Sequence, residues 1–167
     1  DVVAMTSYAP LLAKEKFTQW HTDLIYFNNT EVKPTVNYTV QHLYGNNAGD
    51  QYIESSIELT DSKETVRKRV GASVVYDSQT GDYIVKLANL LPVEVKTTVT
   101  IDGIGSADTS AAMTQLTGKP GDRQATPTTT TIAVDKGFTV TLPAYSFTVV
   151  RLRQAQLTLR QAQPTTR

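Results

Sequence analysis

The sequence contains no cysteine and only two histidines among its 167 residues. The absence of cysteine excludes disulfide bonds, thiolate nucleophiles and sulfur-ligated metal sites. His21 and His42 have no partner at the spacing of a metal-binding motif, so we expect neither a metal nor another cofactor. The lack of cysteine does not identify the compartment, because a well-packed domain of this size needs no disulfide.

The chain also lacks an excess charge of either sign and any long apolar run. Sixteen Lys and Arg balance sixteen Asp and Glu, and the isoelectric point is about 6.9. A nucleic-acid-binding domain is expected to carry a basic stripe, and a membrane-surface helix a cationic face. No apolar run approaches the roughly 18 residues of a membrane span. We therefore expect a neutral partner, and neither nucleic acid nor membrane.

The first residues, Asp1-Val2-Val3, lie inside an apolar segment with no basic stretch before it. A signal peptide would begin with such a stretch. We expect the sequence to be a piece of a longer protein. Its compartment stays open, with the extracellular space or periplasm favoured over the cytoplasm.

Residues 1–47 have the pattern of a strand, a long connection and a helix. Val2–Thr6 is a nearly continuous apolar run, typical of a strand buried on both faces. The long connection contains the strand-like segment Leu24–Phe27. Apolar residues recur at helical spacing through Pro34–Tyr44, whose proline suits a first helical turn, and Gly45 is a suitable helix stop. The pattern predicts one βα unit with an unusually long loop.

From about Gln51 onward the pattern is that of an all-β domain. Residues 77–82 have the composition of a hairpin turn between two β-branched runs. Val93–Ile101 alternates apolar and polar residues, which indicates a strand with one buried face. The threonine-rich segment 125–131 is interpreted as a loop that leads into an edge strand rather than as a glycosylated linker. The other predicted strands are Val70–Tyr76, Tyr83–Leu91, Ala111–Leu116, Gly137–Leu142 and Tyr145–Leu152. Short strands separated by turn signals favour an antiparallel sandwich.

Four blocks of this sequence resemble family 51 α-L-arabinofuranosidases, in the same order. They are Asp1–Leu12, Trp20–Asn29, Pro34–Tyr38 leading to Gly49-Asp50, and Leu142–Val150. The likeness extends from Asp1 to Leu152, which is nearly the whole chain. Four ordered blocks are more specific than a single short motif.

The resemblance implies a mainly β fold with three parts. Residues 1–47 would be the last strand, loop and helix of a (β/α)8 catalytic barrel. Residues 48–152 would form an antiparallel β-sandwich of jelly-roll type, and residues 153–167 a mobile tail. Without the rest of the barrel, we expect residues 1–47 to be partly disordered or packed opportunistically on the sandwich or on another chain.

The resemblance also implies an enzyme whose chemistry lies elsewhere. The family is similar to other retaining glycosidases, which use two carboxyl groups about 5 Å apart. In the family these are glutamates on the fourth and seventh barrel strands, upstream of this chain. None of this chain's acidic residues matches those motifs, including Glu15, Glu31, Glu54, Glu58 and Glu64. No catalytic residue is therefore expected here, and the chain alone is predicted to be inactive.

Two residues of the long loop are candidates for substrate binding. Barrel enzymes place substrate contacts in the loops after their strands. Asp23 matches a polar position that contacts the sugar in the family, although it could instead cap a turn or pair with a basic residue of the barrel. Trp20 could stack on a sugar ring, but a lone tryptophan is more often a packing residue.

The implied partners are an arabinose-containing oligosaccharide or polysaccharide, the upstream barrel of the same enzyme, and further copies in a homo-oligomer. The alternative is a non-catalytic module, either carbohydrate-binding or structural. A carbohydrate-binding sandwich usually presents aromatic side chains along one strand face. Here the tyrosines of the β region are scattered and no tryptophan accompanies them, which weakens this alternative.

Overall fold

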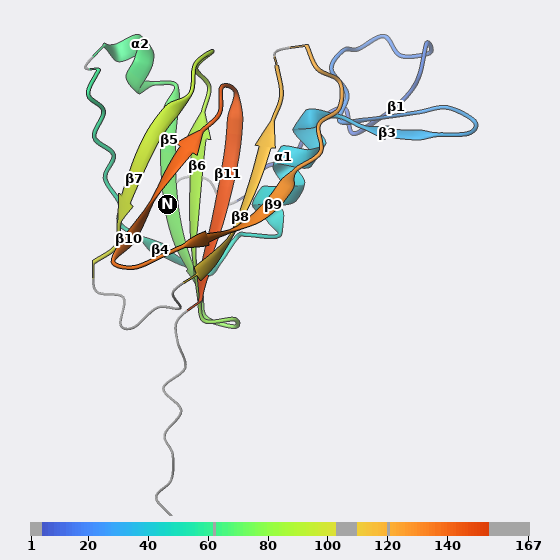
Figure 1. Cartoon of the computed structure of the whole chain (residues 1–167). Helices are drawn as coiled ribbons and strands as arrows, with labels where there is room; N and C mark the ends of the chain where they lie inside the picture. Colours follow the sequence, from blue (N-terminus) through green and yellow to red (C-terminus); the bar gives the residue numbers. More distant parts are fainter. Residues whose placement is uncertain (1–4, 62, 103–109, 120, 154–167) are drawn as a thin grey trace, which may run out of the picture.

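The structure is a computed structural model that describes residues 5–61, 63–102, 110–119 and 121–153 (Figure 1). The two helices are α1 (Val36–Gly45) and α2 (Glu64–Arg67). The strands are β1 (Leu12–Lys14), β2 (Ile25–Phe27), β3 (Val32–Pro34), β4 (Gln51–Ile53), β5 (Val70–Asp77), β6 (Asp82–Asn89), β7 (Val95–Thr100), β8 (Ser110–Thr117), β9 (Thr128–Ala133), β10 (Gly137–Leu142) and β11 (Ser146–Arg153).

The larger part of the described chain is mainly β, as predicted, and its sheets are antiparallel. Six strands form one sheet in the order β4-β5-β6-β11-β8-β9, and β10 pairs with β7 in a second. The last described strand, β11, lies inside the large sheet, where Val150 pairs with Val85 of β6 and Met113 of β8. The large sheet is therefore joined across its middle by the strand that comes last in the sequence.

The two sheets face each other across an apolar core, and together they are called the two-sheet body here. Phe138, Val140 and Leu142 of the small sheet meet Val85 and Leu87 of the large sheet. The outward side chains of β7 are exposed and its inward ones half-buried, as the alternation of Val93–Ile101 predicts.

Helix α1 covers part of the opposite face of the large sheet. Its Leu43 packs in a second apolar cluster with Ile84, Leu116 and Phe147 of the sheet. Because β6 and β11 lie between α1 and the small sheet, most of their side chains are buried on both faces. Alternating burial is correspondingly absent from these two strands.

Helix α1 begins two residues later than the sequence pattern predicts. Pro34 pairs with Ile25 as the last residue of β3, which keeps it extended. Thr35 then caps the helix, because its hydroxyl accepts a hydrogen bond from the Tyr38 amide at 3.3 Å. The helix includes Gly45, the predicted stop, and Asn46 follows it as the C-cap.

The segment before α1 forms a small sheet of its own. Its order is β1-β2-β3, with β1 parallel and β3 antiparallel to β2. This sheet and its connections, residues 5–34, are called the N-terminal arm. Figure 1 shows the arm projecting beyond the side of the two-sheet body where α1 lies. Of the predicted strand Val2–Thr6, Met5 and Thr6 lie outside any strand, and the other residues are outside the described ranges.

The sheet strands predicted from β-branched runs are all present. The β5–β6 hairpin closes at residues 77–82, with Gly81 in the left-handed region at φ +75°. Of the threonine-rich segment predicted as a loop, residues 125–127 lead into the edge strand β9, whereas residues 128–131 belong to that strand. The tail beyond Arg153 lies outside the described residues, and the domain limits at 47 and 152 stay predictions. No helix in the described ranges is long and apolar enough to cross a membrane.

One arginine joins α1 to the two-sheet body. Arg151 of β11 donates hydrogen bonds to Asn47 Oδ1 at 3.0 Å and to Asp82 Oδ2 at 2.9 Å. Its guanidinium also lies 3.5 Å from Asp77 Oδ2. Asn47 in turn donates to the Leu43 carbonyl in the last turn of α1. This network holds the C-terminal end of α1 against the β5–β6 hairpin.

The family-like pair Gly49-Asp50 has a structural explanation at the same place. A side chain at position 49 would put its Cβ 2.7 Å from a Val75 methyl and 2.8 Å from the Tyr76 carbonyl, with φ at +68°. Only glycine fits such a site without strain. Asp50 accepts hydrogen bonds from the amide and hydroxyl of Ser78 at 2.8 and 2.6 Å. The pair therefore fixes the connection between α1 and β4.

Candidate functional site

Both predicted sugar-contacting residues lie on the connection between β1 and β2, but in opposite environments. Asp23 is 1% exposed, whereas Trp20 is 68% exposed. Thr18 lies between them: its hydroxyl accepts a hydrogen bond from the Trp20 amide at 3.1 Å and lies 3.5 Å from Asp23 Oδ2. The amide of Asp23 donates to the Tyr26 hydroxyl at 3.1 Å. The loop thus brings the two residues together through Thr18, which the sequence did not single out.

One carboxylate oxygen of Asp23 has no hydrogen-bond partner within the described ranges. Asp23 Oδ1 is buried and unpartnered, while Oδ2 has only the long contact from Thr18. A buried polar atom is normally paired, so an unpaired carboxylate oxygen needs a donor from outside the described residues. A sugar hydroxyl or a basic group of another segment would both supply one. The role of Asp23 in sugar binding stays a prediction.

The Trp20 ring is available for stacking because the arm does not pack it. Phe17, three residues earlier, is 78% exposed, and the Lys14 ammonium lies over its ring, 5.2 Å from the centroid. Because Trp20 is largely exposed, it is not a packing residue within the described part of the chain. Its role in sugar binding also stays a prediction.

Three carboxylates, Glu15 of the arm, Asp50 before β4 and Asp77 of the β5–β6 hairpin, have a lowered pKa. Hydrogen bonds from Lys33 and Asn28 lower the pKa of Glu15, and hydrogen bonds from Ser78 lower the pKa of Asp50. Burial acts to raise the pKa of Asp77, but hydrogen bonds from the turn and the charge of Arg151 outweigh it, and that pKa is lowered too. A general acid for glycoside cleavage needs a raised pKa instead. These groups are therefore suited to holding structure rather than to proton transfer.

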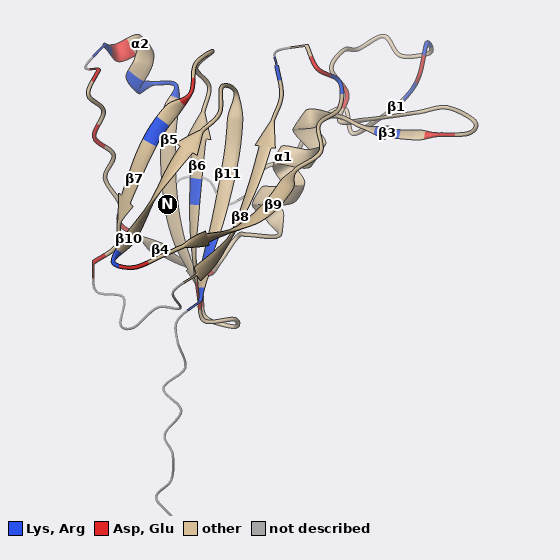
Figure 2. Cartoon of the chain, in the orientation of Figure 1, with Lys and Arg blue, Asp and Glu red and all other residues tan. Residues whose placement is uncertain are grey.

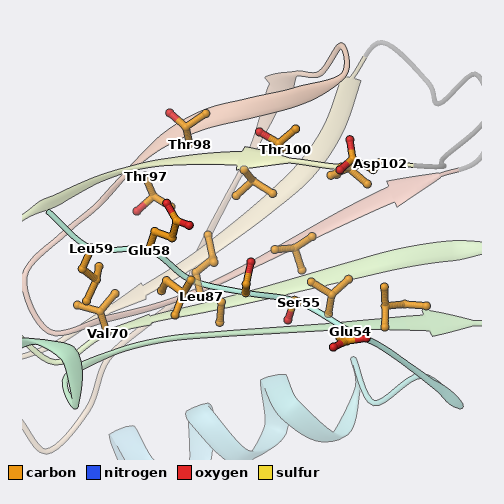
Figure 3. Close-up of a pocket in the computed structure, with 18 of the residues that line it drawn as sticks. Glu54, Ser55, Glu58, Leu59, Val70, Leu87, Thr97, Thr98, Thr100 and Asp102 are labelled. Atoms are coloured by element: carbon orange, nitrogen blue, oxygen red, sulfur yellow. The ribbon is translucent and has the colours of Figure 1, made fainter.

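A cavity of about 400 Å³ opens between β7 and the segment 53–59, above β5 and β6 (Figure 3). Val70, Val74 and Leu87 contribute to its apolar floor. Figure 3 shows Glu54 and Glu58 at separate places along its border rather than facing each other as a catalytic pair. Tyr83 is the single aromatic residue among those that line it. The cavity therefore lacks the aromatic platform on which a sugar ring would stack.

The histidines do not form a metal site in the described ranges. His21 is exposed in the arm, and His42 is exposed on α1, where it stacks on Tyr38 at a centroid distance of 5.9 Å. No group of three or more histidine or acidic side chains is close enough to hold a metal ion in the part of the chain described.

The sequence pattern did not predict the burial of two polar residues of the two-sheet body. Asn89 is fully buried, and its amide donates to the carbonyls of Val93 and Pro143 at 2.8 Å each. Lys86, 6% exposed, lies on the face of β6 that α1 covers. Alternation along β6 places Lys86 on one face, but nothing local to β6 indicates that a helix buries that face.

Comparison with known proteins places this arrangement in a family. A sequence model of the α-L-arabinofuranosidase C-terminal domain matches residues 1–146. A probable α-L-arabinofuranosidase A of Aspergillus terreus is 34% identical over 157 residues, which cover 90% of this chain and 24% of that protein. An extracellular exo-α-L-arabinofuranosidase of Streptomyces chartreusis is 45% identical over 74 residues, 44% of this chain and 9% of that protein.

A solved structure gives the same result for the fold. An arabinose-bound family 51 α-L-arabinofuranosidase superposes with a TM-score of 0.77 at 29% identity. The match covers 89% of this chain and 24% of that one. The chain therefore spans about a quarter, or less, of each of these three proteins.

Proposed function

Because this chain belongs to the family of α-L-arabinofuranosidase C-terminal domains, we propose that it is the C-terminal region of a retaining glycoside hydrolase. The whole enzyme would release terminal α-L-arabinofuranosyl residues from arabinan or arabinoxylan. The observation that carries the proposal is the family match across residues 1–146, because it includes the N-terminal arm, α1 and every strand of the two-sheet body before β11. An isolated carbohydrate-binding sandwich would not require the arm.

In this proposal the arm and α1 are the last βα unit of a (β/α)8 barrel, and the two-sheet body is a sandwich of jelly-roll type. The exposure of apolar side chains in the arm supports it. Exposed large apolar side chains of the arm are Met5, Leu11, Leu12, Phe17, Trp20 and Val32. Such a concentration in 30 residues marks a surface that another part of a protein covers. The neighbouring strands and helices of the barrel would provide that cover.

The catalytic carboxyl groups are assigned to the upstream part of the enzyme. The lowered pKa of Glu15, Asp50 and Asp77 and the separation of Glu54 from Glu58 both support this assignment. The role of this region is then to support the barrel and to form one wall of its active site.

That wall is the connection between β1 and β2. Asp23, with its free buried oxygen, would accept a hydrogen bond from a sugar hydroxyl, and the exposed Trp20 would stack on a sugar ring. The compartment would be extracellular, as for the Streptomyces relative by its name. Assembly into a homo-oligomer is part of the same proposal.

Hydrolysis of p-nitrophenyl α-L-arabinofuranoside tests whether the catalytic groups lie upstream of this chain. We expect turnover by the full-length protein and none by residues 1–167 alone, with the mass of each protein confirmed. Turnover by the short chain that is lost when one of its own carboxylates is replaced would contradict the proposal.

Two substitutions in the full-length protein test the wall. We expect Asp23→Asn to reduce kcat/KM about 10-fold or more, since a hydrogen bond to a charged group is weakened. Trp20→Ala is expected to raise KM up to about 10-fold through the loss of stacking. Lys96→Ala, at an exposed position of β7, is the control and should leave both constants unchanged. Equal effects of all three substitutions would show that Asp23 and Trp20 do not form a substrate-binding wall.

A further inference from the structure

The connection between β1 and β2 exposes basic and aromatic side chains together. Lys14 and Lys16 flank Glu15 where the chain leaves β1, and both lysines are exposed (Figure 2). The Lys14 ammonium lies over the ring of Phe17, which is itself largely exposed. The chain as a whole carries equal numbers of basic and acidic residues, so this positive charge is a local feature. Lys14, Lys16, Phe17 and Trp20 are called the basic-aromatic loop.

The acidic residues of the same connection do not neutralise the two lysines of the loop. Lys33 of β3 donates hydrogen bonds to both carboxylate oxygens of Glu15, at 3.0 and 3.1 Å. The second acidic residue, Asp23, is buried. Within the described ranges, neither Lys14 nor Lys16 forms an ion pair. Two exposed cations without a neutralising group attract an anion from solution.

Lys16 has a backbone conformation that lysine rarely adopts. Its φ is 65°, in the left-handed region, which is unfavourable for a residue with a long side chain. The turn around it is closed by the Phe17 amide, which donates to the Lys14 carbonyl at 3.0 Å. Glycine would occupy this position without strain. The strain therefore favours a function for the Lys16 side chain.

We propose that the basic-aromatic loop binds a uronic acid residue of an arabinose-bearing polysaccharide. The inference rests on the proposed function, which makes this connection a wall of the sugar-binding site. The carboxylate of the uronic acid would pair with Lys14 or Lys16, and a sugar ring beside it would stack on Phe17. A neutral polymer would use the aromatic side chains but neither lysine. The preferred substrate is therefore an acidic polysaccharide that carries arabinofuranosyl side chains.

The test compares two forms of one polymer with the full-length protein. The first is a glucuronoarabinoxylan, and the second is the same preparation with its uronic acids reduced to neutral sugars. Arabinose release should give a kcat/KM about 3-fold or more higher for the acidic form at low salt, because exposed charge pairs contribute modestly. Lys14→Gln/Lys16→Gln should abolish this preference by raising KM for the acidic form. About 0.5 M NaCl should weaken the preference of the unchanged protein in the same way.

Further variants separate the charge from the stacking and from the turn. Lys14→Arg/Lys16→Arg should keep the preference, since it keeps both charges. Lys16→Gly should reduce the preference although glycine suits the turn, because the charge is lost. Phe17→Ala should raise KM for both forms and leave their ratio unchanged. Lys96→Gln/Lys136→Gln is the matched control, because it removes two exposed charges of the two-sheet body, and it should change neither value.

Equal kcat/KM values of the unchanged protein for the two forms would overturn this inference and leave the proposed function standing. A preference that persists in Lys14→Gln/Lys16→Gln would overturn it as well. If that variant also had a lower Tm, the lysines would be assigned to a carboxylate of the upstream part of the enzyme. Release of arabinose from neither form would instead contradict the proposed function, and the inference with it.

Discussion

The N-terminal arm and the two-sheet body differ in how far their apolar side chains are buried. Of the eleven exposed large apolar residues in the described part of the chain, six lie in the arm, which buries only Ala13 and Leu24. In the two-sheet body, β6 and β11 are covered on both faces by parts of the same chain. Apolar burial is the main favourable term in folding, so the body closes its own core and the arm does not.

The arm is held instead by polar contacts. Lys33 forms an ion pair with Glu15 at 3.0 Å and with Glu31 at 3.2 Å. The Asn28 side chain donates to Glu15 and accepts from the amide of Thr30. Exposed ion pairs of this kind contribute little free energy each. The described arm therefore relies mainly on polar contacts and strand pairing, whereas the body has an apolar core of its own.

The largest expected difference between the two regions is the loss in free energy of unfolding when one leucine of each is truncated. Leu142 of β10 is 1% exposed and lies in the core between the sheets. Leu142→Ala should lower the free energy of unfolding by about 3 kcal/mol through lost burial and a cavity. Leu12→Ala in the arm, where the side chain is 58% exposed, should change it by less than about 0.5 kcal/mol. Urea unfolding of both variants measures the contrast, and equal losses would refute it.

Adding a methyl group tests how tightly the body is closed. A Cβ on Gly137 would clash with the Val99 carbonyl oxygen, where β10 pairs with β7. Gly137→Ala should therefore destabilise the body by about 2–3 kcal/mol. Gly45→Ala is the control, since nothing lies within 4 Å of that position and alanine favours a helix. Thermal unfolding should show a lower Tm for the first variant and an unchanged or raised Tm for the second.

Removing Arg151 would loosen the joint between α1 and the body. Arg151→Gln leaves the Asp82 carboxylate buried without its main partner. Loss of one partner of a buried pair costs about 3–5 kcal/mol, and partial exposure of Arg151 reduces this to about 2 kcal/mol. Lys68→Gln, which breaks an exposed pair with Glu64 on α2, should cost only about 0.3 kcal/mol. Guanidinium unfolding that ranks the two variants equally would contradict this account of the joint.

The smallest effect is a pH dependence confined to the arm. The pKa of Glu15 is lowered from 4.5, so its contribution is present above that pH and is lost as pH falls through the lowered value. The pKa of Lys33 is raised from 10.5, so its contribution is present below that pH and is lost as pH rises through the raised value. NMR titration of the Glu15 carboxyl group should give a pKa below 4.5 that returns towards 4.5 in Lys33→Met. An unchanged Glu15 titration in that variant would show that the ion pair has no role.

The elements that could be predicted from the sequence are those whose own residues determine their environment. Val93–Ile101 alternates because one face of β7 meets the core, and residues 77–82 contain the turn residues that the β5–β6 hairpin uses. In the arm, β2 lies within the predicted strand-like segment Leu24–Phe27, whereas β1 and β3, of three residues each, are too short for a period to be recognised. The start of α1 was missed because the pairing of Pro34 with Ile25 is a tertiary contact.

For the site residues too, the sequence predicted identity but not the environment that tertiary contacts create. Family-like motifs identified Asp23 and Trp20, but not that the first is buried and the second exposed, since burial depends on how the loop folds around Thr18. Arg151 contacts groups from 69 to 105 residues away, and no local pattern indicates such partners. Lys86 could be assigned to a face of β6 but not to a buried one, because the covering helix is distant in sequence.

The position of β11 in the large sheet makes the order of synthesis matter. During translation β4, β5 and β6 emerge well before β11, and β8 and β9 emerge between them, so the two halves of the sheet have no common hydrogen-bonded strand until Ser146–Arg153 is available. A nascent chain that stops before Ser146 exposes two unpaired strand edges and the apolar faces beside them. We therefore expect truncation there to direct the polypeptide to chaperones or aggregation, and completion of the last strand to be the step that commits the body to fold.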